Sequence, residues 1–172
     1  MGPGTFCRIA FAAGLALGAA APAATAQTPS SLSETYGDWV VRCESAEENR
    51  RCWMQQTLTR QPGGERVLQL ELTEVDGVIR AVFLTPFGLD VAKGAVLAAD
   101  GTDLGTFPFH TCLPAGCLVQ FEPPQPLLDA LRRGDTLTAT FQVAQSGESL
   151  ALELSLNGFS AAHKRLEGFA SN

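Results

Sequence analysis

The sequence predicts an all-β fold, an antiparallel β-sandwich or irregular barrel of about nine short strands with one short helix. Turn signals such as Asp76-Gly77 and Asp100-Gly101 punctuate the chain about every 8 to 12 residues, the spacing typical of sandwiches. Between these turns, apolar and polar residues alternate with the period of two that half-buried strands show. No longer period recurs, so nothing indicates a repeat array.

The first 26 residues have the pattern of a secretory signal peptide. Arg8 precedes an apolar, Ala-rich run over residues 9–21, and Ala24-Thr25-Ala26 forms an A-x-A cleavage site. The run is shorter than the roughly 20 residues of a spanning helix, which favours cleavage over an uncleaved anchor. We therefore expect cleavage after Ala26 and a mature chain, beginning at Gln27, that is periplasmic or secreted. Cys7 precedes the run and would be lost.

The mature chain is expected to hold a flexible lead-in over residues 27–35 and a single domain over residues 36–172. The full chain has 12 basic and 18 acidic residues, a formal net charge of −6. This balance argues against nucleic acid and against an anionic membrane surface as partners, because both require clustered basic side chains. No second apolar run approaches membrane length, so no transmembrane segment is expected after cleavage. No motif indicates a cofactor.

Four cysteines remain after cleavage, an even number that indicates two disulfides in an oxidising compartment. A loop of about 70 residues costs roughly 2 kcal/mol more to close than one of about 6 residues. We therefore expect the two sequence-local pairs, Cys43 with Cys52 and Cys112 with Cys117. A four-cysteine zinc site is the disfavoured alternative, because its usual paired spacing is absent.

The domain is expected to begin with a strand over residues 36–43, in which Trp39, Val41 and Cys43 lie on one side. A charged loop then leads to a second strand over residues 52–59. The first disulfide would bind these two strands, which carry both tryptophans.

The later strands are predicted by the same alternation, which is clearest at Leu68, Leu70 and Leu72. A Pro-rich connection over residues 122–126 cannot be a central strand, and it leads into a short helix, Leu127 to Arg133. One terminal helical turn is expected near the end of the chain, at residues 161–166. The expected later strands span residues 67–74, 78–84, 89–98, 102–109, 117–121, 136–143 and 150–156.

The search for catalytic motifs is mostly negative. His110 and His163 are the two histidines, and neither has the neighbours of a metal-binding motif. There is no G-x-S-x-G elbow and no Gly-rich phosphate loop. A carboxylate pair such as Glu71 with Asp90 can be drawn across a sheet, but no spacing selects it. Two classes stay open: a non-catalytic exported binding or envelope-associated protein, which we favour, and a hydrolase acting through carboxylates or His110 without a recognisable motif.

Two loops are candidates for contact with a partner, because each could expose an aromatic ring or a proline. One is the break at Pro86 and Phe87. The other is the Pro-rich connection with Phe121, Pro123 and Pro124. The alternative in both cases is that these residues serve turn formation alone.

Several short motifs occur in a characteristic order along the mature chain. They are Gly37-Asp38-Trp39, the cysteines Cys43 and Cys52, Pro86-x-Gly88 followed by Gly94, Pro108-Phe109 before Cys112, Gly116-Cys117, and Ser155-Leu156-Asn157-Gly158-Phe159. Taken together, these motifs resemble the invasion-associated locus B family. The resemblance implies a secreted or periplasmic bacterial β-sandwich protein without an assigned reaction, named for a link with entry into host cells. It supplies no catalytic residues and names no partner.

Overall fold

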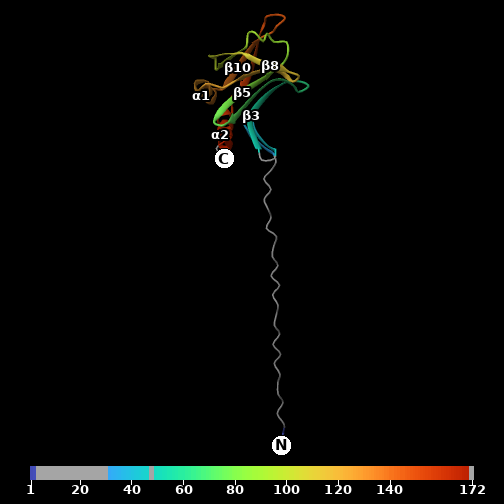
Figure 1. Ribbon diagram of the computed structural model, residues 1–172, viewed down its shortest axis with the longest axis vertical. Helices are drawn as coiled ribbons and strands as arrows, with labels where there is room; N and C mark the ends of the chain where they lie inside the picture. Colours follow the sequence, from blue (N-terminus) through green and yellow to red (C-terminus); the bar gives the residue numbers. More distant parts are fainter. Residues whose placement is uncertain (3–30, 47–48, 171–172) are drawn as a thin grey trace.

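The computed structural model describes residues 1–2, 31–46 and 49–170. Two antiparallel sheets are arranged as a sandwich, and two helices lie together at one side of it (Figure 1). The predicted all-β antiparallel sandwich is thereby confirmed. The predicted signal peptide and its cleavage site lie outside the described residues. Within the described part of the chain, no helix is long and apolar enough to cross a membrane.

One sheet has seven strands in the order β1-β2-β3-β4-β5-β9-β8, and the other has four in the order β11-β10-β6-β7. The helices are α1 (Gln125–Arg133) and α2 (Phe159–Ala170). The strands are β1 (Ser31–Tyr36), β2 (Trp39–Ala46), β3 (Asn49–Arg60), β4 (Glu65–Val75), β5 (Val78–Thr85), β6 (Ala95–Ala99), β7 (Thr102–Phe107), β8 (Phe109–Leu113), β9 (Gly116–Phe121), β10 (Thr136–Gln142) and β11 (Ser149–Ser155).

The alternating pattern of β4 places its leucines in the core, as predicted. Leu68, Leu70 and Leu72 are fully buried, while the residues between them are half-buried on the opposite face. The turn at Asp76-Gly77 joins β4 to β5, and both turn residues have positive φ angles (53° and 75°). Positive φ at both central residues is the requirement of the two-residue hairpin that Asp-Gly favours.

A buried polar contact ties the two sheets together. The Trp39 indole Nε1–H on β2 donates a hydrogen bond of 2.9 Å to the carbonyl oxygen of Ser155 on β11. The Gln56 side chain on β3 donates to the same oxygen at 2.9 Å and accepts from the Ser155 N–H at 2.9 Å. The buried Gln56 side chain is hydrogen-bonded to backbone groups, so no free energy is lost to an unpaired polar group. These hydrogen bonds help to specify how the two sheets align.

Two of the motifs that resemble the family are far apart in sequence but contact each other next to these inter-sheet hydrogen bonds. The backbone N–H of Asp38 donates to the carbonyl oxygen of Asn157 at 3.1 Å. Gly37 has a φ of +56°, and a Cβ at this position would lie 2.6 Å from the Asn157 oxygen. A side chain at Gly37 would therefore clash with the turn that begins α2.

The flexible lead-in expected over residues 27–35 is wrong from Ser31 onward. Residues 31–36 form the edge strand β1, which pairs with β2 so that Leu32 lies opposite Cys43. The polar sequence of these residues does not predict a strand, because β1 is stabilised by contacts with distant segments. Glu34, for example, accepts two hydrogen bonds from the Arg165 guanidinium of α2, at 2.7 and 2.9 Å.

Two further strand predictions need correction. The strand expected over residues 89–98 is limited to β6, because residues 89–94 form the connection from β5 and only Leu89 makes an isolated bridge, to Val143. The strand expected over residues 102–109 is broken at Pro108 into β7 and β8, which belong to different sheets. Proline lacks a backbone N–H and permits the chain to change sheets at this point.

The helix predicted over Leu127 to Arg133 is present as α1, with Leu127, Leu128 and Leu131 buried. The single turn expected over residues 161–166 is instead the longer helix α2. It packs on β1 to β4 of the seven-stranded sheet. Phe159 buries its ring against Trp39 with centroids 5.0 Å apart in an edge-to-face contact. Such packing stabilises a helix that local sequence does not predict.

Candidate functional site

Each of the two disulfides links the two strands of one hairpin, and the two hairpins differ in their surroundings. Cys43 and Cys52 lie opposite each other on β2 and β3, and Cys112 and Cys117 lie opposite each other on β8 and β9. Both pairings are the sequence-local ones that loop closure predicts. Within the described residues, no group of three or more His, Cys, Asp or Glu side chains is placed to hold a metal ion.

The β8–β9 hairpin borders a surface hollow that we call the edge-strand hollow. Its volume is about 240 Å³, and it is lined by Val91, Phe109, His110, Thr111 and Cys112. Cys112 is exposed beside the hollow, whereas Cys117 is buried with 5% of its surface accessible. One sulfur-bearing residue of this disulfide therefore faces solvent and the other faces the core.

β8 is an edge strand of the seven-stranded sheet, and its pairing with β9 contains a bulge. Phe109 pairs with Val119 and Thr111 pairs with Leu118, so His110 is the extra residue. A bulge redirects a side chain and interrupts regular pairing. The exposed His110 consequently lines the edge-strand hollow and also a second hollow of about 360 Å³, on whose rim lie Arg80 and Glu122.

The hairpin is pressed closely onto β5. The Thr85 hydroxyl donates a hydrogen bond of 3.0 Å to the carbonyl oxygen of Cys117. Gly116 has a φ of +141°, and any Cβ there would collide with the carbonyl oxygen of Thr85. Glycine is therefore required where β9 begins, and the hairpin rests on a rigid neighbour.

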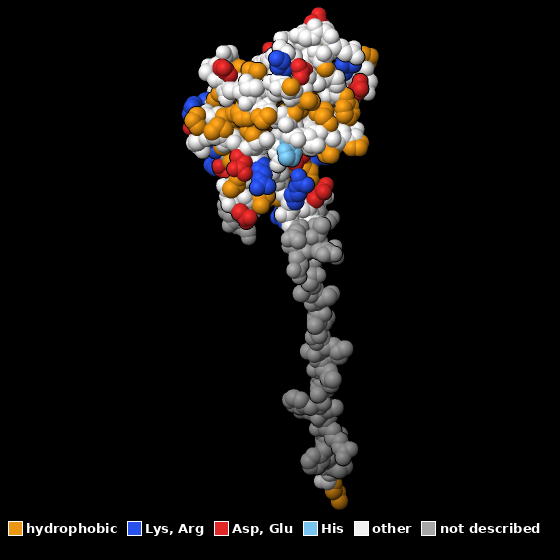
Figure 2. Space-filling view, turned by 45° about the horizontal axis from the view of Figure 1, so that its top comes forward, with side chains coloured by type: hydrophobic (Ala, Val, Ile, Leu, Met, Phe, Trp, Pro, Cys, Tyr) orange, Lys and Arg blue, Asp and Glu red, His pale blue; other side chains and the backbone are white. Residues whose placement is uncertain are grey.

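Exposed hydrophobic side chains surround the same hairpin. Phe87 is 62% exposed, Val91 50% and Leu113 49%. Phe87 lies two residues after Thr85, the last residue of β5, which pairs with Cys117, and Leu113 closes the hairpin opposite Gly116. We call Phe87, Val91 and Leu113 the hairpin patch. Hydrophobic side chains also form a visible band across the face of the domain drawn in Figure 2, above a group of charged ones.

The predicted partner-binding residues divide into exposed and packed ones. Phe87 is exposed and Pro86 half-buried, and Pro124 is exposed where it caps the start of α1. Phe121, in contrast, stacks on Phe107 with ring centroids 4.0 Å apart. Pro123 is buried beside the core leucines. The expected exposure is therefore not found at the buried Pro123 and is only partial at the half-buried Phe121, because both pack against neighbouring elements, whereas contact with a partner stays a prediction.

The catalytic candidates are not brought together. In the described part of the chain, no hydrogen bond or ion pair joins His110 to another side chain. Glu71 pairs with Arg51 at 3.0 Å, and Asp90 accepts a hydrogen bond of 3.1 Å from the backbone N–H of Ala92. Each carboxylate therefore has its own local partner, and the pair drawn from the sequence has no geometric support.

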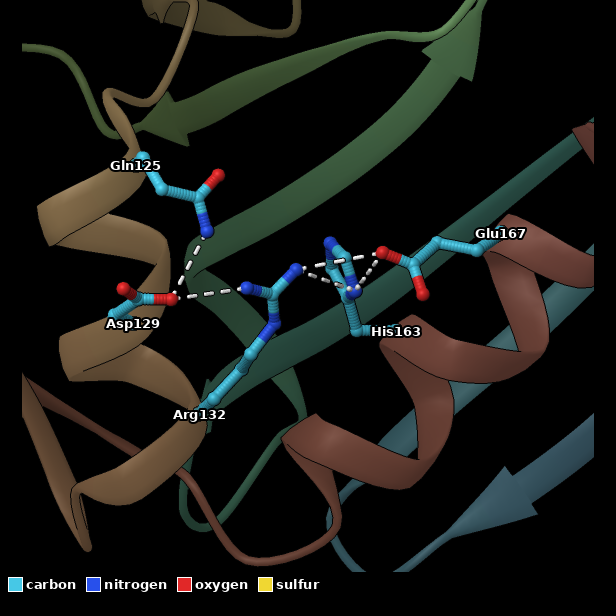
Figure 3. Close-up of polar contacts among 5 residues, drawn as sticks. All are labelled: Gln125, Asp129, Arg132, His163 and Glu167. Atoms are coloured by element: carbon cyan, nitrogen blue, oxygen red, sulfur yellow. Dashed lines mark hydrogen bonds and ion pairs between the residues drawn. The ribbon is translucent and has the colours of Figure 1, made fainter.

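A polar cluster between α1 and α2 was not predicted from the sequence (Figure 3). Arg132 on α1 contacts Asp129 at 3.1 Å and Glu167 of α2 at 3.3 Å. The Nδ1 atom of His163 lies 3.3 Å from the Glu167 carboxylate and 3.5 Å from the Arg132 guanidinium. The signal that could have found it is the spacing of Phe159, His163 and Glu167 at successive helical turns.

His163 is a buried neutral residue within this cluster. Only 1% of its surface is accessible, and its Nε2 atom has no hydrogen-bond partner among the described residues. Burial lowers the pKa of His163; the Glu167 carboxylate opposes that effect, and the Arg132 guanidinium adds to it. The arrangement holds two helices together and does not present His163 to a substrate.

The Cys43–Cys52 disulfide lies near a smaller hollow beneath α2. This hollow has a volume of about 80 Å³ and is lined by Arg50, Cys52, Glu74, Leu166 and Phe169. Burial raises the pKa of Glu74, and the nearby Glu167 carboxylate raises it further. The Arg50 guanidinium lies 4.8 Å from the centre of the Phe169 ring. Helix α2 therefore covers the approach to this disulfide.

Comparisons with known proteins agree with this architecture. The model of the family described as "Invasion associated locus B (IalB) protein" matches residues 39–167. An Invasion protein B homolog of Brucella abortus is 41% identical over 141 residues, covering 80% of each chain. Invasion protein B of Bartonella bacilliformis is 36% identical over 143 residues, covering 80% of this chain and 75% of that protein.

A solved structure has the same fold. The crystal structure of invasion associated protein B from Bartonella henselae superposes with a TM-score of 0.74 at 31% identity, covering 81% of this chain and 97% of that one. The family match, the curated relatives and this structure all agree with the resemblance seen in the sequence. The chain belongs to the invasion-associated locus B family.

Proposed function

We propose that the protein is an exported, non-catalytic binding protein of the bacterial envelope or the secreted fraction. The observation that carries this proposal is the hairpin patch, in which Leu113 of the disulfide-bound hairpin and Phe87 and Val91 of the neighbouring β5–β6 connection are exposed. Exposed apolar side chains gathered on a rigid scaffold are typical of protein-binding surfaces, because little entropy is lost when they are covered.

Two other features support export and binding. Two disulfides in a chain with a signal-peptide pattern are typical of proteins that fold in an oxidising compartment. The separation of His110 from Glu71 and Asp90 in their contacts gives no support to the hydrolase alternative. The relatives are named for invasion, and a contact with a host-cell protein is one form that the proposed binding could take.

Proximity cross-linking in the native envelope tests the proposal. Phe87→Ser should remove a reproducible cross-linked partner, because it deletes the most exposed aromatic side chain of the hairpin patch. Val78→Ser is the matched control, since Val78 is also exposed but lies on the β4–β5 hairpin. A partner captured equally by both variants would contradict the assignment of the surface.

A substrate panel tests the non-catalytic part of the proposal. Purified protein would be assayed with ester, glycoside and peptide substrates, and we expect no turnover above the buffer rate. Turnover that disappears in His110→Ala would overturn the proposal in favour of a hydrolase. Intact-mass analysis of exported protein tests export itself, since the chain should then begin at Gln27.

A further inference from the structure

We propose that the Cys112–Cys117 disulfide is a thiol-exchange site that low-molecular-mass thiols can open in the folded protein. The Cys43–Cys52 disulfide is the inert structural counterpart. This inference goes beyond the binding function and does not depend on it, because it concerns the chemistry of one disulfide and needs no partner protein.

Access to sulfur favours the second disulfide. Cys112 is exposed and lines the edge-strand hollow of about 240 Å³, which is large enough to admit a thiol of the size of cysteine. Thiol–disulfide exchange requires a thiolate to reach one sulfur directly, so exposure decides which disulfides react. The buried Cys117, at 5% accessible, leaves Cys112 as the sulfur that is attacked.

The first disulfide lacks this access. Cys43 is 2% accessible, and Cys52 is half-buried beneath α2. The hollow beside Cys52 is about 80 Å³, and the ring of Phe169 and the carboxylate of Glu74 form part of its wall. This hollow has about a third of the volume of the edge-strand hollow, and α2 closes one side of it through Leu166 and Phe169, so a thiolate has less room to reach Cys52 than to reach Cys112.

The exchange balances in two steps. A thiolate forms a bond to Cys112 Sγ, the Cys112–Cys117 bond breaks, and Cys117 leaves as a thiolate that takes a proton from water. A second thiolate then attacks the sulfur of the bound thiol, which releases a symmetrical small-molecule disulfide and leaves Cys112 as a thiolate. The protein is reduced by two electrons, and two thiol molecules are oxidised.

His110 is the side chain placed to assist the first step. It lines the same hollow as Cys112, where a ring N–H can donate a hydrogen bond to an incoming thiolate. His110 acts here as a positioning residue for that thiolate. Its removal should slow the exchange.

Opening this disulfide should leave the domain folded. β9 is still held by β5 over five paired residues, from Ala81 with Phe121 to Thr85 with Cys117. β8 has only β9 as a neighbour and already carries a bulge. The loss of the bond would therefore loosen β8 and Leu113 and leave the sandwich intact.

Timed reduction of the native protein tests the inference. The oxidised mature protein would be incubated with 2-mercaptoethanol or reduced glutathione at pH 7.5, quenched with N-ethylmaleimide and mapped by mass spectrometry. We expect Cys112 and Cys117 to be labelled at least about tenfold faster than Cys43 and Cys52, while the circular dichroism spectrum stays native. Equal rates, faster labelling of Cys43 and Cys52, or no labelling of Cys112 and Cys117 in the native state would overturn it.

Variants of Val91 test whether the edge-strand hollow is the route. Val91→Trp should fill the hollow and slow reduction by glutathione several-fold, and Val91→Ala should speed it. Val75→Trp is the matched control, because Val75 is similarly exposed on the β4–β5 hairpin. Unchanged rates in both Val91 variants would rule out this route. His110→Ala should slow the reduction, and His110→Gln, which keeps an N–H donor, should restore part of the rate. An unchanged rate in His110→Ala would exclude its role.

Discussion

The two disulfide-bound hairpins differ in what surrounds them. The β2–β3 hairpin lies inside the seven-stranded sheet, carries Trp39 and Gln56, and is covered by α2. The β8–β9 hairpin lies at the opposite end of the same sheet, with an exposed cysteine and a bulge. One disulfide therefore stabilises the core at the β2–β3 hairpin, and the other stabilises a surface hairpin, β8–β9. Burial, and not the bond itself, determines which role a disulfide has.

Removal of each disulfide gives the largest expected effects. Cys43→Ser with Cys52→Ser should cost about 4 kcal/mol in the free energy of unfolding, because the link is lost and a buried hydroxyl replaces a sulfur. Cys112→Ser with Cys117→Ser should cost about 2 kcal/mol, since one serine is exposed and the ring is short. Thermal or denaturant unfolding measures both. A larger loss from the second variant would reverse the comparison.

The second-largest loss of stability is expected when the hydrogen bonds between Gln56 of the β2–β3 hairpin and the other sheet are removed. Gln56→Ala should destabilise the protein by about 2 kcal/mol, because it removes the two hydrogen bonds between the buried Gln56 side chain and the half-buried backbone of Ser155. Gln120→Ala is the control on the β8–β9 hairpin, where the exposed side chain should contribute less than about 0.5 kcal/mol. Equal effects in urea unfolding would mean that the two hairpins do not differ in this way.

The pH dependence of stability should follow His163, which lies on α2, the helix that packs on the β2–β3 hairpin. The pKa of buried His163 is lowered, so the unfolded chain takes up a proton before the folded one does. The stability is fully present above about pH 6.5 and is lost as the pH falls from there toward the folded pKa. Arg132 and Glu167 are the charged groups that contact it, from α1 and α2.

Substitution of His163 tests this assignment. His163→Leu should flatten the part of the stability profile between about pH 7.5 and 5.5 that His163 contributes. Burial raises the pKa values of Glu71 and Glu74, which contribute the opposite slope in the unchanged protein and in the variant alike, so the difference between the two profiles is compared. A profile that is the same in His163→Leu as in the unchanged protein would contradict the assignment. Urea unfolding across this range provides the measurement.

The smallest loss of stability is expected when the hydrogen bond between β5 and the β8–β9 hairpin is removed. Thr85→Val removes the hydrogen bond to the carbonyl oxygen of Cys117 and should cost about 1 kcal/mol. The loss should be local: hydrogen exchange of the β8 and β9 amides should accelerate while that of β3 and β4 stays slow. Uniform acceleration across the sheet would show that this hairpin is part of the cooperative core.

Much of the local structure could be predicted because it depends on neighbours in sequence. The alternation at Leu68, Leu70 and Leu72 specified which face of β4 is buried. Loop closure favoured both disulfide pairs. The Asp-Gly turns specified two hairpins, since both residues must adopt positive φ angles. The order of short motifs was enough to indicate the family.

The tertiary structure decided the rest, because those features depend on contacts between distant segments. β1 is a strand because β2 and Arg165 hold it, and its own sequence is polar. Phe87 and Phe121 both lie near a strand end and close to prolines in sequence, yet Phe87 is exposed and Phe121 stacks on Phe107. The burial of His163 likewise requires α1 and α2 to meet. The alternation of residues in a sequence predicts which side chains share one face of a strand, but it does not predict which other elements pack on that face. This packing determines which of these residues remain accessible to solvent, a thiol or a partner.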